Sequence, residues 1–303
     1  MSAPFIAVEW ATTQLRARLL APDGTSLGEY REAVRLADLD REGIAAHLDA
    51  IVSHLAEGAE RILLSGMIGS AMGWREVPRV ACPAGAEAIA RGVVEDRIGA
   101  HRVAFVPGLH CTSRFGDPDV LRGEEIAALG VLAELGQERA QLLSVPGMHG
   151  KWLDLGAGRV QSFSTSMTVD LHQLLAEHSI LAPLMTPPPE DMEAFAKGVH
   201  RAAGGGGIAR LLFAARSAVV LGALHEAAAA SYLWGVLIGS DVREQIGGGA
   251  DVRVIGAAPA ASLFRAAIVQ LGGVAREADS DATMARGFAA IARLLGPAWE
   301  QAA

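Results

Sequence analysis

Cysteine is scarce in this sequence, which contains only Cys82 and Cys111 among 303 residues. Two cysteines, with no CxxC pair and no Cys/His cluster, exclude a disulfide framework and a structural zinc site. Their scarcity predicts a protein of the reducing cytoplasm. Residues 1–8 lack a basic stretch followed by an apolar one, so the sequence also predicts no secretory signal.

Long hydrophobic runs and excess positive charge are missing as well. The most apolar region, residues 218–238, is interrupted by His225 and Glu226, which disfavours a membrane span. A net charge of −8 and a pI near 5.6 disfavour a nucleic-acid surface.

Among 26 basic residues only Lys151 and Lys197 are lysines. Since arginine is used almost everywhere else, the lysine at position 151, in a turn between two strands, points to a specific role.

Neither common nucleotide-binding motif occurs, because the chain has no GxxxxGK[ST] and no GxGxxG after a strand. A different pattern occurs twice instead: strand, tight turn, strand, Gly-containing turn, strand, then a helical pattern. The copies span residues 4–30 and 141–166, with helices expected at 44–55 and 171–178. The duplication predicts two similar lobes whose turn tips converge on a cleft, where backbone N–H groups can grip a phosphate chain.

Composition and element order predict an α/β protein of two domains. Hydrophobic residues make up 51% of the chain and the mean hydropathy is +0.29, which is typical of a substantial core. The predicted N-terminal lobe spans residues 1–118 and the C-terminal lobe 119–303, beginning with a bridging helix at 119–135. Ligands in such sheets bind beyond the carboxyl ends of strands. The loops at residues 9–13, 65–70, 146–151 and 256–259 are therefore the expected site loops.

The remaining elements are expected from periodicity and turn residues. Further strands are predicted at 61–64, 102–106 and 252–255, and irregular segments at 71–84, 109–118, 183–189 (proline-rich) and 204–207 (four glycines). Helices are predicted at 86–94, 120–135, 208–221, 227–244, 260–270 and 282–295.

Six segments together resemble the 2-dehydro-3-deoxygalactonokinase family. They are SGMIGSAMGWREVP (65–78), DVLRGEE (119–125), PGMHGKW (146–152), SMT (166–168), SYLWGVLIG (231–239) and VIGAAPAASLFRAAI (254–268). That family belongs to the superfamily of sugar kinases, actin and heat-shock chaperone ATPases. The resemblance implies a two-lobed, duplicated ribonuclease H-like fold with an interdomain cleft. It also implies ATP-dependent, Mg²⁺-assisted phosphorylation of the terminal hydroxyl of 2-dehydro-3-deoxy-D-galactonate in galactonate catabolism.

The resemblance places the first phosphate turn at residues 9–13, with Thr12 and Thr13 binding the cofactor and Glu9 binding the metal. Relatives usually have Asp-Trp-Gly here, whereas this chain has Glu9 and Ala11 in the outer positions. Glutamate keeps hard oxygen ligands for Mg²⁺ but reaches one methylene further. Ala11 suits a tight turn only with negative φ. An ordinary hairpin with a carboxylate at its edge is the alternative interpretation.

The second phosphate turn is expected at residues 146–151. Gly147 frees the backbone, His149 can donate to phosphate, and Lys151 offers a point charge. The family commonly has threonine at the position of Met148, so one hydroxyl donor is missing. Asp170 stands where relatives tend to have glutamate, and is predicted as an outer Mg²⁺ contact or, alternatively, as a helix cap. A neutral structural histidine is the alternative for His149.

A carboxylate at the start of the bridging helix accepts the hydroxyl proton in related sugar kinases. Glu124 is the predicted catalytic residue and Asp119 the second candidate. The role is mostly orientation, because phosphoryl transfer depends on positioning and charge neutralisation. Acidic residues at helix N-termini also occur for dipole reasons alone.

The implied substrate is a carboxylate, so its site needs an arginine fork for bidentate binding. The candidates are the arginines nearest the expected site loops, Arg16, Arg75 and Arg122. Contacts to the sugar hydroxyls are expected from Ser65, Ser70, Trp74 and Glu76. The loop at Gly256 and Ala257 resembles the adenosine-side loop of the superfamily, and the glycines at 204–207 form its opposite wall or a linker.

The predicted partners are therefore the sugar acid and ATP with Mg²⁺, without nucleic acid or membrane, and with a homodimer left open. Two alternatives remain. One is a kinase of the same fold for another 2-keto-3-deoxy sugar acid. The other is a catalytically weak sugar- or nucleotide-binding protein, suggested by the departures at Glu9, Ala11 and Met148.

Overall fold

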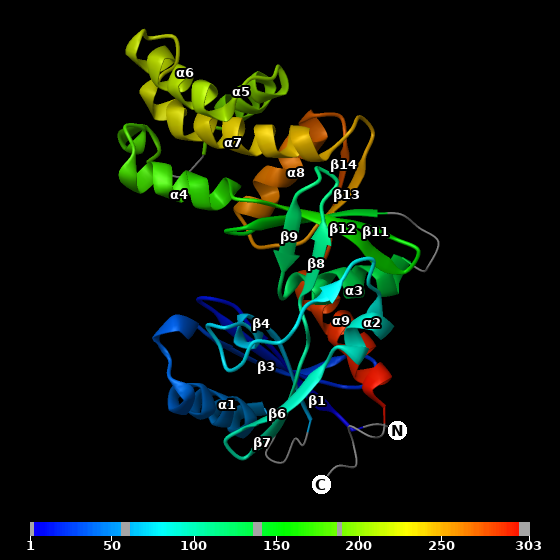
Figure 1. Ribbon diagram of the computed structural model, residues 1–303. Coiled ribbons are helices and arrows are strands. Elements are labelled where there is room, and N and C mark those ends of the chain that lie inside the picture. The colour runs from blue at the N-terminus through cyan, green and yellow to red at the C-terminus, as the bar shows by residue number, and fades with distance from the viewer. Residues whose placement is uncertain (1–2, 56–60, 136–140, 187–189, 297–303) are drawn as a thin grey trace. The chain divides into compact units, whose positions relative to one another are not determined.

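Strands and helices alternate along the chain in the computed structural model, which describes residues 3–55, 61–135, 141–186 and 190–296 (Figure 1). The chain divides into two units. Unit 1 comprises Met1–Ala140, Leu153–Phe163 and Asp279–Ala303, and unit 2 comprises Gln141–Trp152 and Ser164–Ala278. The predicted boundary between residues 118 and 119 does not coincide with this division, because residues 119–140 and the C-terminal segment group with unit 1.

Unit 1 contains a six-stranded sheet with the order β3-β2-β1-β4-β7-β6. β1 (Phe5–Trp10), β2 (Leu15–Leu20) and β3 (Ser26–Glu32) form the predicted antiparallel hairpins, and β4 (Ile62–Gly66) and β7 (His101–Phe105) run parallel to β1. All five residues of β4 are buried, which is the pattern of a strand covered on both faces. β6 (Val94–Ile98) lies antiparallel to β7.

Three longer helices and one short helix complete unit 1. α1 (Arg41–Leu55) packs Ile44, Leu48 and Ile51 into the core beneath β1, β4 and β7. α3 (Glu124–Leu135) and α9 (Ser280–Leu295) pack directly on each other. Their close approach depends on two glycines, since a Cβ on Gly130 would lie 1.9 Å from the Thr283 carbonyl oxygen, and one on Gly287 would lie 2.0 Å from that of Ile126. α2 is short, at Ala86–Arg91.

A small three-stranded sheet lies where the sequence predicts irregular segments. β5 (Val80–Ala81) pairs parallel with β8 (Leu109–Thr112), which pairs antiparallel with β9 (Pro118–Leu121). These strands are short and carry no clear alternation of polar and apolar residues, so tertiary pairing rather than local pattern determines them. The predicted helix at 120–135 correspondingly begins later, at Glu124.

The second sheet repeats the arrangement of the first. Its order is β12-β11-β10-β13-β14, and the parallel strands are β10 (Gln141–Val145), β13 (Asp251–Val254) and β14 (Val274–Glu277). β11 (Gly150–Gly156) and β12 (Arg159–Ser166) form the hairpin beside β10. Each sheet thus places a hairpin next to a parallel run, which confirms the predicted duplication and the α/β class. β14 and β6 were not predicted.

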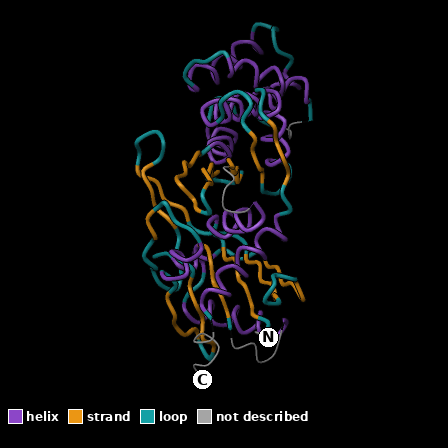
Figure 2. The backbone as a smooth tube through the Cα atoms, turned by 90° about the vertical axis from the view of Figure 1, so that its right-hand side faces the viewer, coloured by secondary structure: helices purple, strands orange, loops and turns teal. Residues whose placement is uncertain are grey.

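The described residues of unit 2 include five α-helices: α4 (Thr168–His178), α5 (Met192–Ala203), α6 (Ile208–Val220), α7 (Ala229–Gln245) and α8 (Ala260–Gln270). Figure 2 shows helices gathered at the upper end of the view, where Figure 1 labels α5, α6 and α7. α5 and α7 pack so closely that a Cβ on Gly198 would lie 2.1 Å from the Tyr232 carbonyl oxygen. The predicted loop at 183–189 falls partly outside the described residues and otherwise contains a short 3-10 turn, Ala182–Leu184.

None of the helices in the described ranges combines the length and apolar composition that a membrane crossing requires.

Candidate active site

The carboxyl ends of β1 and β4 bring two predicted residues together in unit 1. Glu9 and Ser65 are register partners on these adjacent parallel strands, so their side chains leave the sheet on the same face. Directly after Ser65 the chain turns at Gly66, whose φ is +92°. A Cβ there would lie 2.6 Å from the Trp10 carbonyl oxygen, so only glycine permits this turn.

Glu125, which was not singled out from the sequence, holds Ser65 in place. The Ser65 hydroxyl donates to Glu125 Oε1 at 2.7 Å, and the Gly123 N–H donates to Oε2 at 2.6 Å. The side chain is fully buried, and burial raises the pKa of this carboxyl to about 7, against the lowering effect of both hydrogen bonds. A carboxyl that titrates near neutrality inside a polar cluster is typical of functional sites.

Arg122 is the predicted arginine with unsatisfied donors. Its Nη2 donates to the Val77 carbonyl oxygen at 2.8 Å, while its Nε and Nη1 are buried without a hydrogen-bond partner among the described residues. Burial, followed by the charge of Arg79, lowers the pKa of the Arg122 guanidinium. Arg79, which sequence reasoning missed, also has a buried, unpaired Nε. Two adjacent guanidinium groups with free donors form a strong site for an anion.

Most of the other substrate-binding residues predicted in unit 1 form contacts with other residues of that unit. Arg75 pairs with Asp96 at 3.0 Å, and the Ser70 hydroxyl donates to the Met67 carbonyl oxygen within a short 3-10 turn, Met67–Gly69. Trp74 is half-buried, with the Arg41 guanidinium 4.3 Å from its ring centroid, so it is not the exposed aromatic residue that the glycine-rich loop suggests. Glu76 is exposed, and its Oε1 lies 4.0 Å from Arg79.

The two predicted catalytic carboxylates lie on different elements. Glu124 is the first residue of α3, where its Oε2 accepts from the Arg122 N–H at 3.2 Å. Asp119 lies in strand β9 rather than at the start of the helix, opposite Cys111 of β8. Glu124 therefore belongs to the same cluster as Arg122 and Glu125. This cluster also includes Ser65, which bonds to Glu125, and Gly66, which Gly123 approaches closely.

The first turn, between β1 and β2, exposes Thr12 and Thr13. It is closed by a hydrogen bond from the Ala11 N–H to the Gln14 carbonyl oxygen at 2.9 Å. Among the described non-glycine residues only Ala157 has positive φ, so Ala11 meets the backbone condition expected of it. Arg16 is the register partner of Glu9 on β2, and its Nη2 lies 3.4 Å from Gln14 Oε1.

The second turn, between β10 and β11 in unit 2, exposes Met148 and His149 and buries Lys151. His149 Nε2 lies 3.3 Å from Asp170 Oδ2, and the Asp170 N–H donates to the Met148 carbonyl oxygen at 3.3 Å. Asp170 thus ties the first turn of α4 to the phosphate turn. Within the described part of the chain Lys151 forms no ion pair, which leaves its ammonium available to an anion.

The predicted adenosine loop lies against this turn. A Cβ on Gly256 would lie 3.2 Å from the Pro146 carbonyl oxygen, so the ends of β10 and β13 approach each other closely. Gly256 and Ala257 are exposed at that edge. The phosphate and adenosine loops predicted for this half of the molecule are therefore neighbours.

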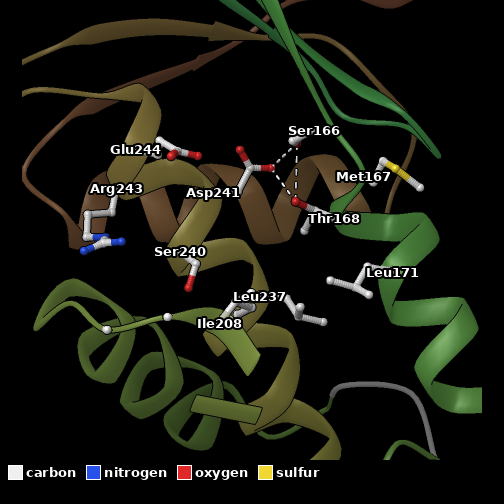
Figure 3. Close-up of a pocket in the computed structure, with 12 residues that line it drawn as sticks. Ser166, Met167, Thr168, Leu171, Ile208, Leu237, Ser240, Asp241, Arg243 and Glu244 are labelled. Carbon is white, nitrogen blue, oxygen red and sulfur yellow. Dashed lines mark hydrogen bonds between the residues drawn. The ribbon is translucent and has the colours of Figure 1, made fainter. Parts of the chain in front are cut away.

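A pocket of about 340 Å³ opens in unit 2 between α4, α7 and the loop before α6 (Figure 3). Gly206 and Gly207 form part of its lining, together with an apolar side and a polar side. The apolar residues of the lining are Met167, Leu171, Ile208 and Leu237, and the polar residues are Ser166, Thr168, Ser240, Asp241, Arg243 and Glu244. The Ser240 hydroxyl is buried without a hydrogen-bond partner among the described residues.

Asp241, another residue that the sequence did not mark, anchors the elements around this pocket. It accepts from the Trp152 Nε1 at 3.0 Å and from the Thr168 hydroxyl at 2.6 Å, and also from the Ser166 hydroxyl (Figure 3). Burial raises the pKa of Asp241, while these three bonds lower it. One buried carboxylate therefore joins α7 to the strand that begins with Gly150 and Lys151.

Oxygen ligands for a cation are available in both units, on Glu9 in unit 1 and Asp170 in unit 2. Glu9 Oε2 is buried and unpaired among the described residues, which suits a group that meets a cation or its bound water. Within the same residues, no cluster of three or more acidic, histidine or cysteine side chains could enclose a metal by itself. Mg²⁺ needs no such cage, because it usually keeps several waters and takes one or two carboxylates together with phosphate oxygens.

Comparison with known proteins gives one consistent result. The model of the 2-keto-3-deoxy-galactonokinase family matches residues 9–291. The chain is 31% identical to the "Probable 2-dehydro-3-deoxygalactonokinase DgoK1" of Rhizobium meliloti (strain 1021), over 97% of this chain and 98% of that protein. It is also 31% identical to the 2-dehydro-3-deoxygalactonokinase of Escherichia coli (strain K12), over 80% of each.

The fold agrees with these sequence matches. A solved structure from Sinorhizobium meliloti, assigned as a 2-dehydro-3-deoxygalactonokinase protein, superposes with a TM-score of 0.88 at 30% identity, covering 97% of this chain and 99% of the other. The family match spans both units and includes every predicted site residue. The chain therefore belongs to the 2-keto-3-deoxy-galactonokinase family.

Proposed function

We propose that this chain transfers the γ-phosphoryl group of ATP to the terminal hydroxyl of 2-dehydro-3-deoxy-D-galactonate, forming the 6-phosphate in D-galactonate breakdown. Unit 1 binds the sugar acid and unit 2 binds ATP. The observation that carries the proposal is Arg122, whose buried Nε and Nη1 have no partner among the described residues. An unpaired buried donor is costly, and a substrate carboxylate would satisfy both donors as a bidentate ligand.

Three neighbouring groups complete the sugar site. Arg79 adds a second guanidinium for the same carboxylate. The Ser65 hydroxyl donates a hydrogen bond to Glu125. Its oxygen therefore remains able to accept a hydrogen bond from a sugar hydroxyl. Glu124, at the start of α3, orients the terminal hydroxyl and accepts its proton.

The nucleotide site uses the second turn and the pocket of unit 2. Lys151 and His149 contact phosphate oxygens, while Gly147 and the threonines of the first turn, Thr12 and Thr13, contribute backbone or hydroxyl donors. The pocket at Gly206 and Gly207 has the volume and the mixed lining expected for a nucleoside. Gly256 and Ala257 form the neighbouring wall.

Mg²⁺ would be held through Glu9 and, on the side of unit 2, Asp170. When bound, the ion neutralises charge on the transferring phosphate. We place the reaction in the reducing cytoplasm, where a metabolic kinase would meet its ATP.

A coupled ADP-release assay with a panel of sugar acids tests the proposal. Turnover is expected with the galactonate derivative. Turnover only with another 2-keto-3-deoxy acid would transfer the proposal to that substrate, and binding measured by calorimetry without turnover would show a binding protein instead.

Arg122→Met provides the residue-level test. It should raise the KM for the sugar acid about 10- to 100-fold, since charge-assisted hydrogen bonds contribute about 1.5–3 kcal/mol each, and leave the KM for ATP unchanged. Arg97→Met is the matched control, because among the described residues the Arg97 guanidinium bonds only to the Ala100 carbonyl oxygen in the β6–β7 turn. An unchanged sugar-acid KM in Arg122→Met would contradict the assignment.

A further inference from the structure

A second cavity, of about 580 Å³, lies within unit 1 and contains none of the residues assigned above to catalysis or binding. Three elements line it: α2, the turn between β11 and β12, and the last turns of α9. Each element contributes one arginine, namely Arg91, Arg159 and Arg293.

Backbone contacts hold two of these walls together. Ala84 and Val160 exchange two hydrogen bonds, of 3.0 and 2.9 Å, so the segment before α2 is paired with the start of β12. A Cβ on Gly85 would lie 2.9 Å from the Gly158 carbonyl oxygen, which shows how closely the segments approach. Ala157 and Gly158 both have positive φ, as in a two-residue hairpin turn that fixes the position of Arg159. α2 also packs against α9. The cavity is therefore a built feature of the unit.

The charge of the cavity is unusual for this protein. In the described part of the chain, none of the three guanidinium groups forms an ion pair or a hydrogen bond, although other surface arginines such as Arg31 and Arg286 pair with carboxylates. Among the described residues that line the cavity, Glu87 is the only acidic one, although the whole chain has a net charge of −8. Three like charges around one space repel one another, and an anion between them would relieve that repulsion.

We propose that this cavity binds a small polyanion, a molecule with two or three phosphate or carboxylate groups. Guanidinium groups on three separate elements match several anionic groups better than one, because each can bind a planar or tetrahedral oxyanion in bidentate fashion. The cavity volume falls within the range of small-molecule sites. Such a ligand would link α2, the hairpin turn and α9, and would stabilise unit 1 by mass action. The site is independent of the proposed kinase reaction.

Isothermal titration of the full chain without Mg²⁺, using inorganic pyrophosphate and citrate as probes, tests this proposal. Binding of at least one probe is expected. The triple variant Arg91→Gln, Arg159→Gln, Arg293→Gln should weaken it at least tenfold, about the effect of losing one charge-assisted hydrogen bond. Binding of pyrophosphate alone would indicate a phosphorylated ligand, and binding of citrate alone would indicate a polycarboxylate. Binding of both probes would indicate that the cavity recognises negative charge in general.

Two controls separate the cavity from other anion sites. The triple variant Arg97→Gln, Arg114→Gln, Arg210→Gln removes the same charge from exposed positions outside the cavity and should bind the probe normally. Lys151→Met, in the nucleotide turn, should also retain it. The proposal is overturned if neither probe binds, if the cavity variant binds normally, or if binding is lost with Lys151 instead. Arg159→Gln alone replaces the triple variant if the latter does not fold by circular dichroism, and should show a smaller loss in the same direction.

Discussion

The two hairpin turns of this molecule share a scaffold and differ in chemistry. Each joins the first two strands of a sheet that continues with parallel strands, in the same spatial order. The turn of unit 1 follows the carboxylate of Glu9 and exposes two threonines, whereas the turn of unit 2 contains two glycines and leads to Lys151, a largely buried residue. The first therefore suits a hydrated cation and the second suits phosphate oxygens.

Cationic groups show the same divergence. In unit 2 the cation of the proposed site, Lys151, lies at the turn itself. In unit 1 the cations of the proposed site, Arg122 and Arg79, lie away from the turn. Duplication supplies two similar sheet edges. In the function proposed above, a few side chains suit one edge to a sugar acid and the other to a nucleotide. Replacing Lys151 should consequently affect ATP, and replacing Arg122 should affect the sugar acid.

The largest effect is expected from Glu124→Gln, which removes the proposed proton acceptor of unit 1. We expect kcat to fall by at least ~100-fold, the lower range for a positioned acid or base, in a steady-state assay. Glu42→Gln is the control, because Glu42 lies in the first turn of α1 and has only a helix-dipole role. A near-normal kcat in Glu124→Gln would transfer the role to Asp119.

Lys151→Met tests the assignment of phosphate binding to unit 2. The KM for ATP should rise about 10- to 100-fold, the effect of losing one or two charge-assisted bonds, while the KM for the sugar acid stays the same. Lys197→Met is a matched control at the only other lysine, which is exposed and pairs with Glu193. An unchanged ATP KM would remove Lys151 from the site.

Asp241→Ala tests whether one buried carboxylate stabilises the elements around the pocket of unit 2. Three hydrogen bonds disappear, and buried donors of Trp152 and Thr168 lose their acceptor. We expect the free energy of unfolding to fall by about 3 kcal/mol, at roughly 1 kcal/mol per bond, measured by urea denaturation. Asp251→Ala, which removes an exposed pair with Arg276, should cost less than about 1 kcal/mol. Equal losses in the two variants would contradict the anchoring role.

The pH dependence of stability tests the buried cluster of unit 1. Burial raises the pKa of Glu125 from 4.5 to about 7, so the folded state binds more protons than the unfolded state between these values. Wild-type stability should therefore fall, relative to Glu125→Gln, as pH rises through this window, and the difference should be constant above it. Denaturation midpoints at pH 5 to 8 would show this, and parallel curves would contradict the raised pKa.

The smallest expected effect is that of Met148→Thr, which restores the hydroxyl donor that relatives commonly have in the second turn. Met148 is exposed at the tip of that turn, so the substitution should not disturb the fold. The KM for ATP should fall about 2- to 10-fold, as expected for one additional hydrogen bond of ~0.5–1.5 kcal/mol. The matched change Met192→Thr, at another exposed methionine, should leave it unchanged.

Much of the fold could be predicted because the relevant signals are local. Both hairpins, the buried strand β4 and the long helices follow from alternation, apolar runs and turn glycines. The short strands β5, β8 and β9 could not be predicted, since they are two to four residues long and are defined by their partners. Because strand β9 could not be predicted, the sequence also predicts too early a start for α3, which begins at Glu124, and assigns Asp119 to a helix rather than to a strand.

Site residues divide in a similar way. Ser65, Lys151 and Arg122 could be proposed from motifs because each lies in or beside a glycine-rich turn. Arg75 could be proposed equally well, but its charge is paired with Asp96. Whether an arginine is paired or free depends on residues distant in sequence, so no local pattern distinguishes the two.

The duplicated α/β plan and the family can be read from the amino-acid sequence alone, because strand periodicity, turn glycines and motif order are local features of the chain. The folded structure is needed to show which polar groups are buried without a partner among the described residues, as at Glu9, Arg122 and Ser240. It is also needed to show which carboxylates hold other groups in place, as at Glu125 and Asp241. Burial and hydrogen bonding depend on neighbours in space. A side chain acquires its pKa, its partners and its free donors only when the chain has folded around it.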